Sequence, residues 1–547
     1  MSNTGKERLK VWTPILFSLI LILGMILGFN LRDSLRNKRN LTTIIQRSDR
    51  LEQLIDLIKD RYVDTVDGNA LYADAVEGIL SHLDPHTLYI PADELGAVEE
   101  KLSGRFFGVG VSFIVINDTM LVTNVVKGGP ADKAGVEKGD RIIKVADSVI
   151  AGKQLSSNVI PDLLKGPEHT VVSVLLKKVN TDKIDSAVIT RGAIPIVSVD
   201  AAVMLDSNTG FIKINRFSNT TYDEFAKALN KLKADGMEHL VLDLRQNPGG
   251  YLDQAINIAD DFIKGDKLLV YTKGNKSVYK EYKAGEKAGF EDGKIVILVD
   301  ESSASASEIL AGAVQDWDRG IIMGRRTYGK GLVQDRYSLQ DGAELRLTIA
   351  KYYVPSGRSI QRSFENGKQA YREDLLDRYE SGELTGNDSV VIVDTTRYYT
   401  ANKRVVYGGG GIIPDVYVPY DTTKISAGLL ELLYSIDMRN KLWQYYFEHK
   451  KELSIYKLPS AFKKEFDAKV IYNYYVKNSD ATTKQLLKLQ MKIKDNQDYF
   501  LLHMKAQLGR ILFDNNGYYK VINDDDIMVQ KALTIMGSNN YDSTIAR

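Results

Sequence analysis

The sequence has no cysteine, which excludes disulfide bonds, thiolate catalysis and cysteine-ligated metal sites. It also has almost no net charge. Its 72 basic and 71 acidic side chains leave +1, which argues against a general nucleic-acid-binding protein. Neither an internal repeat nor a low-complexity tract is present. The rest of the composition, 44% hydrophobic and 26% charged, is typical of a folded protein, and 547 residues are too many for a single hydrophobic core.

A long uncharged run stands near the N-terminus. Residues 11–31 contain no charged side chain and lie between Lys10 and Arg32. At about 1.5 Å per residue, a helix of this length matches a hydrocarbon core of roughly 30 Å. Because no small-residue cleavage site follows, we expect an uncleaved membrane anchor rather than a signal peptide or a buried globular helix. Basic residues flank both ends, so the charge pattern leaves the orientation open.

The remaining chain divides into four segments by the pattern of its apolar residues and glycines. Residues 37–101 have apolar side chains at helical spacing, and residues 102–188 consist of short β-rich runs punctuated by glycine. Strand and helix patterns alternate in residues 189–420, which predicts an α/β domain with a central sheet. Residues 421–547 form a helical, tyrosine-rich extension. With the anchor in residues 1–36, this gives an α/β multidomain protein.

Four serines lie between a predicted buried strand and a predicted helix, at positions 302, 303, 305 and 307. At the carboxyl end of such a strand, free backbone N–H groups and the positive end of the helix dipole would stabilise an oxyanion beside a hydroxyl. The alternative is structural, since Ser305 and Glu308 have the spacing of a capping box. The local sequence leaves both interpretations open.

A nucleophilic serine needs a base, and all six histidines are far from this turn in the sequence. Lys330, between two glycines and ahead of a predicted strand, is an alternative base. Burial disfavours the charged form of a lysine, and a neutral amine activates a serine in Ser-Lys enzymes. The turn 247–250, with the sequence NPGG, offers unobstructed glycine N–H groups as a second oxyanion donor, or is a plain turn.

Taken together, these segments resemble the carboxyl-terminal processing proteases, the tail-specific serine proteases of peptidase family S41 that carry a PDZ domain. The resemblance covers roughly residues 45–420. It is most specific in SASASEILAGAVQDWDRGIIMGRRTYGKGLVQ and extends to LSHLDPHTLYI, GGPADKAGVEKGDRIIKV, LDLRQNPGGYL, YYVPSGRSIQ and GGGGIIPDV.

The resemblance implies a role for each matching residue. Ser305 is the implied nucleophile, Lys330 the general base, and Gln334 the side chain that positions the lysine. The implied oxyanion hole consists of the backbone N–H of Ala306 and of a glycine in the NPGG turn, Gly250 in preference to Gly249. The family uses no metal and no cofactor, so neither is expected.

Residues 102–188 correspond in this resemblance to the PDZ domain. Its carboxylate-binding loop falls on Phe107, Gly108, Val109 and Gly110, whose N–H groups would hold a substrate's C-terminus while the substrate adds a strand to the sheet. A dinucleotide-binding interpretation of this loop fails, because the third glycine is missing and a strand follows instead of a helix.

The resemblance also implies the fold and location. We expect an N-terminal membrane helix, a helical segment, a PDZ β-domain inserted before an α/β Ser-Lys protease core (residues 189–420), and the helical C-terminal extension. Family members act outside the bacterial inner membrane, which would make the catalytic part periplasmic. The expected partners are protein substrates with unstructured C-termini. Residues 421–547 lie outside the resemblance, and either pack on the protease domain or serve a homo-oligomer or adaptor contact.

Two other functions are alternatives to a peptidase that works through an acyl-enzyme. One is an inactive relative that uses its PDZ domain as a scaffold. The intact Ser305, Lys330 and Gln334 argue against it. The other is a hydratase-like enzyme, since the protease core is related to that fold, but a PDZ domain and an anchor disfavour it.

Overall fold

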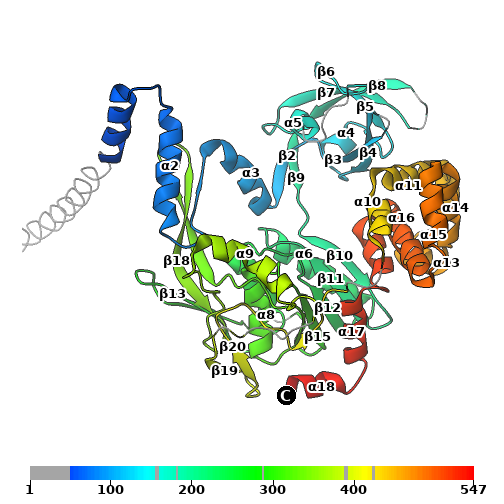
Figure 1. Ribbon diagram of the computed structural model, residues 1–547. Coiled ribbons are helices and arrows are strands. Elements are labelled where there is room, and N and C mark those ends of the chain that lie inside the picture. The colour runs from blue at the N-terminus through cyan, green and yellow to red at the C-terminus, as the bar shows by residue number, and fades with distance from the viewer. Residues whose placement is uncertain are drawn as a thin grey trace, which may run out of the picture. The chain divides into compact units, whose positions relative to one another are not determined.

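The computed structural model describes residues 50–546, except for residues 117, 154–158, 180, 182, 286–288, 387–391, 393 and 422–424 (Figure 1). The predicted membrane anchor, residues 11–31, lies outside the described residues. Within the part of the chain that is described, no helix has the length and apolar character needed to cross a membrane. The described residues divide into two compact units, with the boundary between residues 84 and 85.

In the first unit, residues 50–61 are helical and are followed by helix α2, Gly68–Ser81. Asp67 caps α2, since its carboxylate accepts a hydrogen bond of 2.9 Å from the N–H of Asn69. The apolar spacing of the sequence predicts both helices.

The second unit begins with strand β1, Leu88–Ile90, and helix α3, Ala92–Ser103. Helix α3 ends at Gly104 in the left-handed conformation, with φ 71°, as helix C-termini commonly do. Strand β2, Arg105–Gly108, then pairs antiparallel with β9, Gly192–Pro195. In this two-stranded ribbon, the segment that leads into the following β-domain pairs with the segment that leaves it.

The β-domain is an antiparallel sheet with two short helices. Its strands follow the order β3 (Val111–Ile116), β4 (Thr119–Val125), β5 (Arg141–Val145), β7 (Val171–Lys177) and β8 (Ile184–Thr190); β6 (Ser148–Val149) lies beside β5, and the helices are α4 (Pro130–Lys133) and α5 (Val159–Leu164). Met120, Val122 and Ile142 are among its fully buried side chains. Strand β3 lies at an edge of the sheet and pairs with β4 on one side.

A six-stranded sheet forms the centre of the α/β domain. Its order is β10 (Val199–Met204), β11 (Thr209–Ile214), β12 (His239–Asp243), β15 (Ile295–Val299), β16 (Ile321–Gly324) and β21 (Val416–Tyr417). Strand β10 runs antiparallel to β11, and the other neighbouring strands are parallel. Every residue of β11 and β15 is buried, as expected for strands covered on both faces.

Helices cover both faces of this sheet. Helices α6 (Thr221–Ala234), α7 (Leu252–Asp260) and α8 (Ala306–Asp316) share one buried cluster with strand residues such as Ile297. Helices α17 (Ile527–Met536) and α18 (Asn540–Ala546) share another with Val296 and Leu298, which point to the opposite face. The end of the C-terminal extension therefore packs on the α/β domain, which is one of the two roles considered for it.

The loop that follows β16 leads into a second sheet. Its order is β1, β18 (Glu344–Tyr353), β13 (Leu268–Lys273) and β14 (Lys280–Lys283), with β17 (Leu332–Ser338) on β18. Strands β17 and β18 pair antiparallel as a hairpin that turns about Asp341–Gly342. Helix α9 (Gly367–Glu380) and the pair β19 (Arg397–Tyr399) and β20 (Val405–Tyr407) follow.

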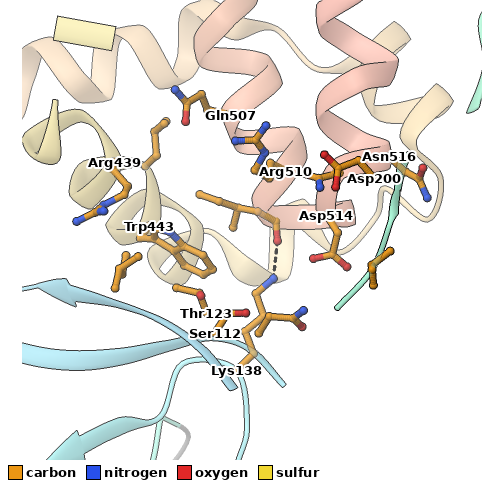
Figure 2. A pocket seen from close by; sticks show the side chains of 16 residues that line it. Ser112, Thr123, Lys138, Asp200, Arg439, Trp443, Gln507, Arg510, Asp514 and Asn516 are labelled. Atoms are coloured by element: carbon orange, nitrogen blue, oxygen red, sulfur yellow. Dashed lines mark hydrogen bonds between the residues drawn. The ribbon is translucent and has the colours of Figure 1, made fainter. Parts of the chain in front are cut away.

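The rest of the extension is a helical bundle that contacts the β-domain. It contains α10 (Ala427–Tyr434), α11 (Ile436–Glu448), α12 (Lys450–Leu453), α13 (Pro459–Glu465), α14 (Ala468–Asn478), α15 (Ala481–Gln490) and α16 (Lys494–Ile522). Ile116 and Leu121 of the β-domain are buried in the bundle's hydrophobic cluster. Lys138 donates to the backbone oxygen of Ile511 and lies 5.3 Å from the ring centre of Trp443 (Figure 2). Burial lowers the pKa of this lysine.

Candidate active site

The four serines lie where β15 leads into α8, and their environments differ. Ser305 is the residue just before α8; its backbone has φ 54° and ψ −113°, and its side chain is half-buried. Ser303 and Ser307 are fully buried, and the Ser307 hydroxyl donates to the backbone oxygen of Asn247 at 3.0 Å. Ser302 is exposed. Ser303 and Ser307 therefore hold the turn, whereas Ser305 presents a hydroxyl at the helix start.

The NPGG turn packs directly against this serine turn. The N–H of Ala304 donates to the backbone oxygen of Asn247 at 3.0 Å. Gly249 has φ 93°, and a Cβ atom added there would lie 2.8 Å from the Cβ of Ser305 and 2.9 Å from the nitrogen of Ala306. No larger residue fits this position without a shift of the backbone. The predicted oxyanion donors and the predicted nucleophile are thus brought together.

The two candidate glycines of the NPGG turn are not equivalent. The N–H of Gly249 donates to the side-chain oxygen of Asn247 at 2.9 Å, so it is already engaged. The N–H of Gly250 donates to no group among the described residues, and neither does the N–H of Ala306. Gly250 and Ala306 are therefore the pair of N–H groups available to an oxyanion.

A single buried carboxylate joins the serine turn to the lysine loop. One oxygen of Glu308 accepts the N–H groups of Ser305 at 2.8 Å and of Lys330 at 2.9 Å. The other oxygen accepts the hydroxyl of Thr327 at 2.6 Å and the N–H of Gly329 at 2.7 Å. Burial raises the pKa of Glu308 to about 7, against the hydrogen bonds, which favour its ionised form. Glu308 thus fixes the backbones of Ser305 and Lys330 relative to each other.

Tyr352 of strand β18 makes a second connection between these residues. Its hydroxyl contacts the backbone oxygen of Ser305 at 3.2 Å and also the backbone oxygen of Lys330. Burial raises the pKa of Tyr352 well above its ordinary value, so the hydroxyl keeps its proton and donates.

The predicted lysine and glutamine are in contact. The amine of Lys330 donates to the side-chain oxygen of Gln334 at 2.9 Å, and the amide nitrogen of Gln334 donates to the backbone oxygen of His86. The ring of His86 is hydrogen-bonded to the hydroxyl of Tyr371, on helix α9, at 2.9 Å. A chain of contacts therefore orients the lysine. It runs from Gln334 on β17 to His86, just before β1, and on to Tyr371 of α9.

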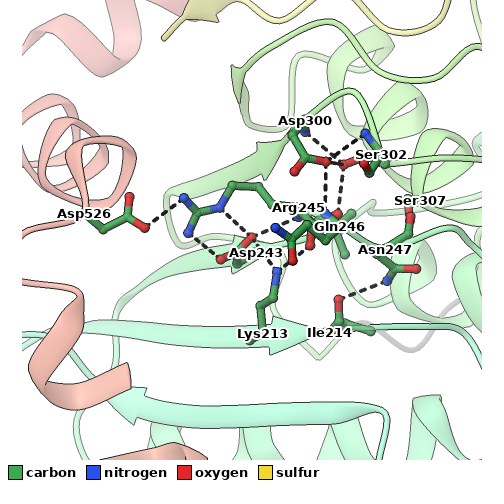
Figure 3. Close-up of polar contacts among 12 residues, drawn as sticks. Lys213, Ile214, Asp243, Arg245, Gln246, Asn247, Asp300, Ser302, Ser307 and Asp526 are labelled. Atoms are coloured by element: carbon green, nitrogen blue, oxygen red, sulfur yellow. Dashed lines mark hydrogen bonds and ion pairs between the residues drawn. The ribbon is translucent and has the colours of Figure 1, made fainter. Parts of the chain in front are cut away.

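A charged network anchors the strand end from which the NPGG turn leaves (Figure 3). The buried carboxylate of Asp243 accepts from Arg245 at 2.6 and 3.0 Å and from Lys213 at 3.1 Å. Burial alone would raise the pKa of Asp243, but Arg245 and Lys213 hold it well below its usual range. Arg245 also pairs at 2.8 Å with Asp526, at the start of α17. The turn at Asn247 is thus fixed to the extension as well as to the sheet.

The predicted carboxylate-binding loop lies in the β-domain. Phe107 and Gly108 belong to β2, and Val109 and Gly110 form the turn into β3. Gly110 has φ 80°, and the N–H groups of Val109 and Gly110 have no partner among the described residues. No hydrogen bond found in the described part of the chain links this loop to the serine turn.

Several contacts that shape the site escape the sequence prediction. Glu308 enters that prediction only as a helix-capping partner, and it does accept the N–H of Ser305 as a capping box requires. Its other three hydrogen bonds are tertiary. Tyr352, Tyr371 and His86 stand in segments whose local patterns give no sign of a site. The motifs LSHLDPHTLYI and YYVPSGRSIQ, which contain His86 and Tyr352, are the available signals for these two residues.

Comparisons with known proteins find two family matches in the chain. Residues 121–178 match the description "PDZ domain", and residues 208–367 match "Peptidase family S41". The chain is 33% identical over 348 residues to the carboxy-terminal-processing protease of Bartonella bacilliformis, covering 62% of this chain and 78% of that protein. It is 31% identical over 361 residues to the carboxy-terminal processing protease CtpA of Bacillus subtilis, covering 65% and 76%. The solved photosystem II D1 C-terminal processing protease is 27% identical, with 57% of this chain and 89% of that chain covered and a TM-score of 0.33.

Proposed function

Because this chain belongs to the carboxy-terminal processing proteases of peptidase family S41, we propose that Ser305 is its nucleophile and Lys330 the base that activates it. The chain is a serine-type peptidase with a PDZ domain. The observation that carries the residue assignment is the double connection between the two backbones, through the carboxylate of Glu308 and the hydroxyl of Tyr352.

The proposed reaction follows from this arrangement. The neutral amine of Lys330 takes the proton of the Ser305 hydroxyl, and the hydroxyl oxygen attacks the substrate carbonyl. The N–H groups of Ala306 and Gly250 stabilise the negative oxygen of the tetrahedral intermediate. When the peptide bond breaks, Lys330 gives its proton to the leaving amine, which leaves an acyl-enzyme. Water, activated by the same amine, then releases the acid product and restores Ser305.

Gln334 is proposed to orient the lysine. Its side-chain oxygen accepts from the amine of Lys330, while its own amide group donates to His86 and so cannot rotate freely. An acceptor in this position directs the lone pair of the neutral amine away from Gln334 and toward the incoming proton.

The β-domain is proposed to recognise the C-terminal tails of unstructured protein substrates. The match to a PDZ domain supports this role, as do the free N–H groups of Val109 and Gly110 beside the edge strand β3. A tail that binds its carboxylate there extends the sheet as an additional strand. Phe107 and Gly108 complete the loop.

We further propose that the protein is anchored in the bacterial inner membrane, with its catalytic part in the periplasm. The support is the run of residues 11–31, which carries no charged side chain.

A fluorophosphonate probe tests the assignment of the nucleophile. The probe reacts with activated serines, so mass spectrometry of the full-length protein should place the label on Ser305. The Ser305→Ala variant should remain unlabelled and should not cleave an unstructured protein. A wild-type protein that takes no label and cuts no substrate would favour the scaffold or hydratase-like alternatives.

A further inference from the structure

A cavity of about 370 Å³ lies beside the proposed catalytic lysine. Its lining includes Lys330, Ala304 next to the proposed nucleophile, and Pro248 of the NPGG turn. Helix α9 supplies Tyr371 and Leu375 on another side. Because the cavity borders the serine turn, the NPGG turn and the lysine loop together, a substrate held at Ser305 would extend a side chain into it.

Most of the charged side chains that line this cavity form ion pairs, and Arg372, which also lines it, is exposed to solvent. Arg362 forms an ion pair with Asp374, and its guanidinium lies 3.9 Å from the ring centre of Tyr371. Arg378 pairs with Glu383 at 2.9 Å.

Glu301, which also lines the cavity, pairs with Arg325 at 2.7 Å. The groups left to meet a ligand are therefore mostly the rings of Tyr328 and Tyr371 and the side chains of Pro248, Ala304 and Leu375. This surface favours an apolar ligand.

Leu375 is the most informative of these residues. It lines the cavity but is 49% exposed, so an occupant would cover apolar surface that now faces solvent. It also lies outside the match to the peptidase family, which ends at residue 367 where α9 begins. The wall that α9 builds is therefore a feature of this chain beyond the matched family segment.

We propose that this cavity binds a bulky apolar side chain, such as Leu, Met or Phe, on a substrate residue that flanks the bond to be cut. The inference rests on the proposed function, since it takes Ser305 and Lys330 as the reacting groups. The PDZ loop would then select the substrate by its tail, and the α9 cavity would select the bond. Leu375 is a residue that determines specificity, and it takes no part in the chemistry.

The test compares two variants of neighbouring leucines in the full-length protein. Leu375→Glu places a negative charge in the cavity wall. Leu376→Glu is its matched control, because Leu376 is on the same helix and 55% exposed but does not line the cavity. Each protein receives one unstructured substrate in a series that varies the two residues flanking its cleavage site.

The wild-type protein should prefer Leu, Met or Phe over Ala or Asp at one flanking position by about tenfold or more in kcat/KM. Leu375→Glu should reduce that preference about tenfold and increase the relative rate with Lys or Arg, whereas Leu376→Glu should behave as wild type. Equal rates across the series, or equal behaviour of the two variants, would overturn the inference. Fluorophosphonate labelling of Ser305, measured on all three proteins, separates that result from a failure of the proposed function, which would abolish labelling of the wild type itself.

Discussion

At the scale of single residues, Ser305 has a backbone conformation that side chains other than glycine rarely adopt. Its φ of 54° places it in the left-handed region, and such residues persist only where the surroundings determine them. The surroundings here are the carboxylate of Glu308 on its N–H and the hydroxyl of Tyr352 on its carbonyl oxygen. The strained turn leaves the hydroxyl half-exposed while the neighbouring N–H of Ala306 stays free.

Replacement of Ser305 by alanine should abolish peptidase activity, with a loss of about a thousandfold or more, and leave the fold intact. Alanine is smaller and keeps the hydrogen bonds of the backbone. The measurement is the cleavage rate of an unstructured protein, with circular dichroism as the check on folding. Ser302→Ala is the control, because that side chain is exposed, and it should retain most activity. Cleavage by Ser305→Ala near the wild-type rate would refute the assignment.

The Lys330→Ala variant should lose as much activity as the serine variant, because no other group takes the proton from the hydroxyl. Lys330→Arg should not restore activity, since a guanidinium group stays protonated. Both variants are assayed with the same unstructured substrate. An active arginine variant would rule out an amine as the base.

Replacement of Glu308 by glutamine should reduce kcat by about tenfold to a hundredfold. The carboxylate accepts four hydrogen bonds, three from N–H groups and one from the Thr327 hydroxyl, whereas an amide turns an NH₂ group toward two of these donors. The NH₂ group would face the donors of either Ser305 and Lys330 or Thr327 and Gly329. Those two hydrogen bonds would be lost, and the connection between the serine turn and the lysine loop would loosen. A variant with unchanged kcat would show that this carboxylate does not position the reacting groups.

The same residue predicts a pH dependence of stability. Burial raises the pKa of Glu308 from 4.5 to about 7. A carboxyl group whose pKa is raised by folding stabilises the folded protein below its unfolded pKa, and this contribution is lost as the pH rises through about 7. The melting temperature of the wild type relative to Glu308→Gln should therefore be more favourable at pH 5 than at pH 8, by the equivalent of up to about 3 kcal/mol. Paired calorimetric scans at the two pH values measure the difference, and a change in the opposite direction would contradict the prediction.

Some parts of the candidate site can be predicted from the sequence for a physical reason. Ser305, Lys330 and Gln334 stand in one short segment, so their spacing is visible in the sequence, and the structure places the lysine on the glutamine. Tyr352 and His86 reach the site only because a hairpin folds back and β1 adds to its sheet. Contacts of that kind depend on strand pairing over long separations, which local patterns do not specify.

At the scale of secondary-structure elements, the central sheet shows the same limit. Buried strands alternating with helices predict an α/β domain, and α6, α7 and α8 cover one face as expected. The second face is covered by α17 and α18, from the far end of the chain. The amphipathic pattern of those helices predicts that they bury a face, but it does not indicate which surface they meet.

A substitution at the start of α17 tests how much this packing contributes to stability. Asp526 accepts the N–H groups of Met528 and Val529 and also pairs with Arg245. Asp526→Ala removes a helix cap and an ion pair between elements, and should destabilise the α/β domain by about 1–2 kcal/mol. Thermal unfolding of the full chain is the measurement.

Asp480→Ala is the matched control for that variant. Asp480 caps α15 through the N–H of Thr483, but its cap lies within the helical bundle and away from the central sheet. It should lower the melting temperature less than Asp526→Ala does. Equal effects would mean that the pair with Arg245 contributes nothing beyond capping.

At the scale of the whole molecule, the β-domain packs one face of its sheet against the helical bundle and leaves the edge strand β3 without a second neighbouring strand among the residues that the structure describes. Side chains of β3 alternate: Phe113 and Val115 pack into the domain's own core, and Ile114 and Ile116 pack against the helical bundle. The backbone edge of β3 remains unpaired within its sheet. An additional strand can therefore join the sheet without disturbing the core of the domain or its contact with the bundle.

This arrangement predicts that cleavage depends on a free C-terminal carboxylate. A carboxylate is strongly hydrated, so holding it requires N–H donors fixed in advance, and Val109 and Gly110 offer two. An amidated version of one unstructured substrate should be cut about tenfold more slowly than its free acid. Gly110→Val should weaken cleavage of the free acid similarly, since Gly110 has φ 80° and its Cβ would lie 2.9 Å from Ile194. Short peptides that reach Ser305 directly should be less affected, which controls for damage to the active site. Equal rates for the acid and the amide would show that the loop does not read the carboxylate, whatever the variant does.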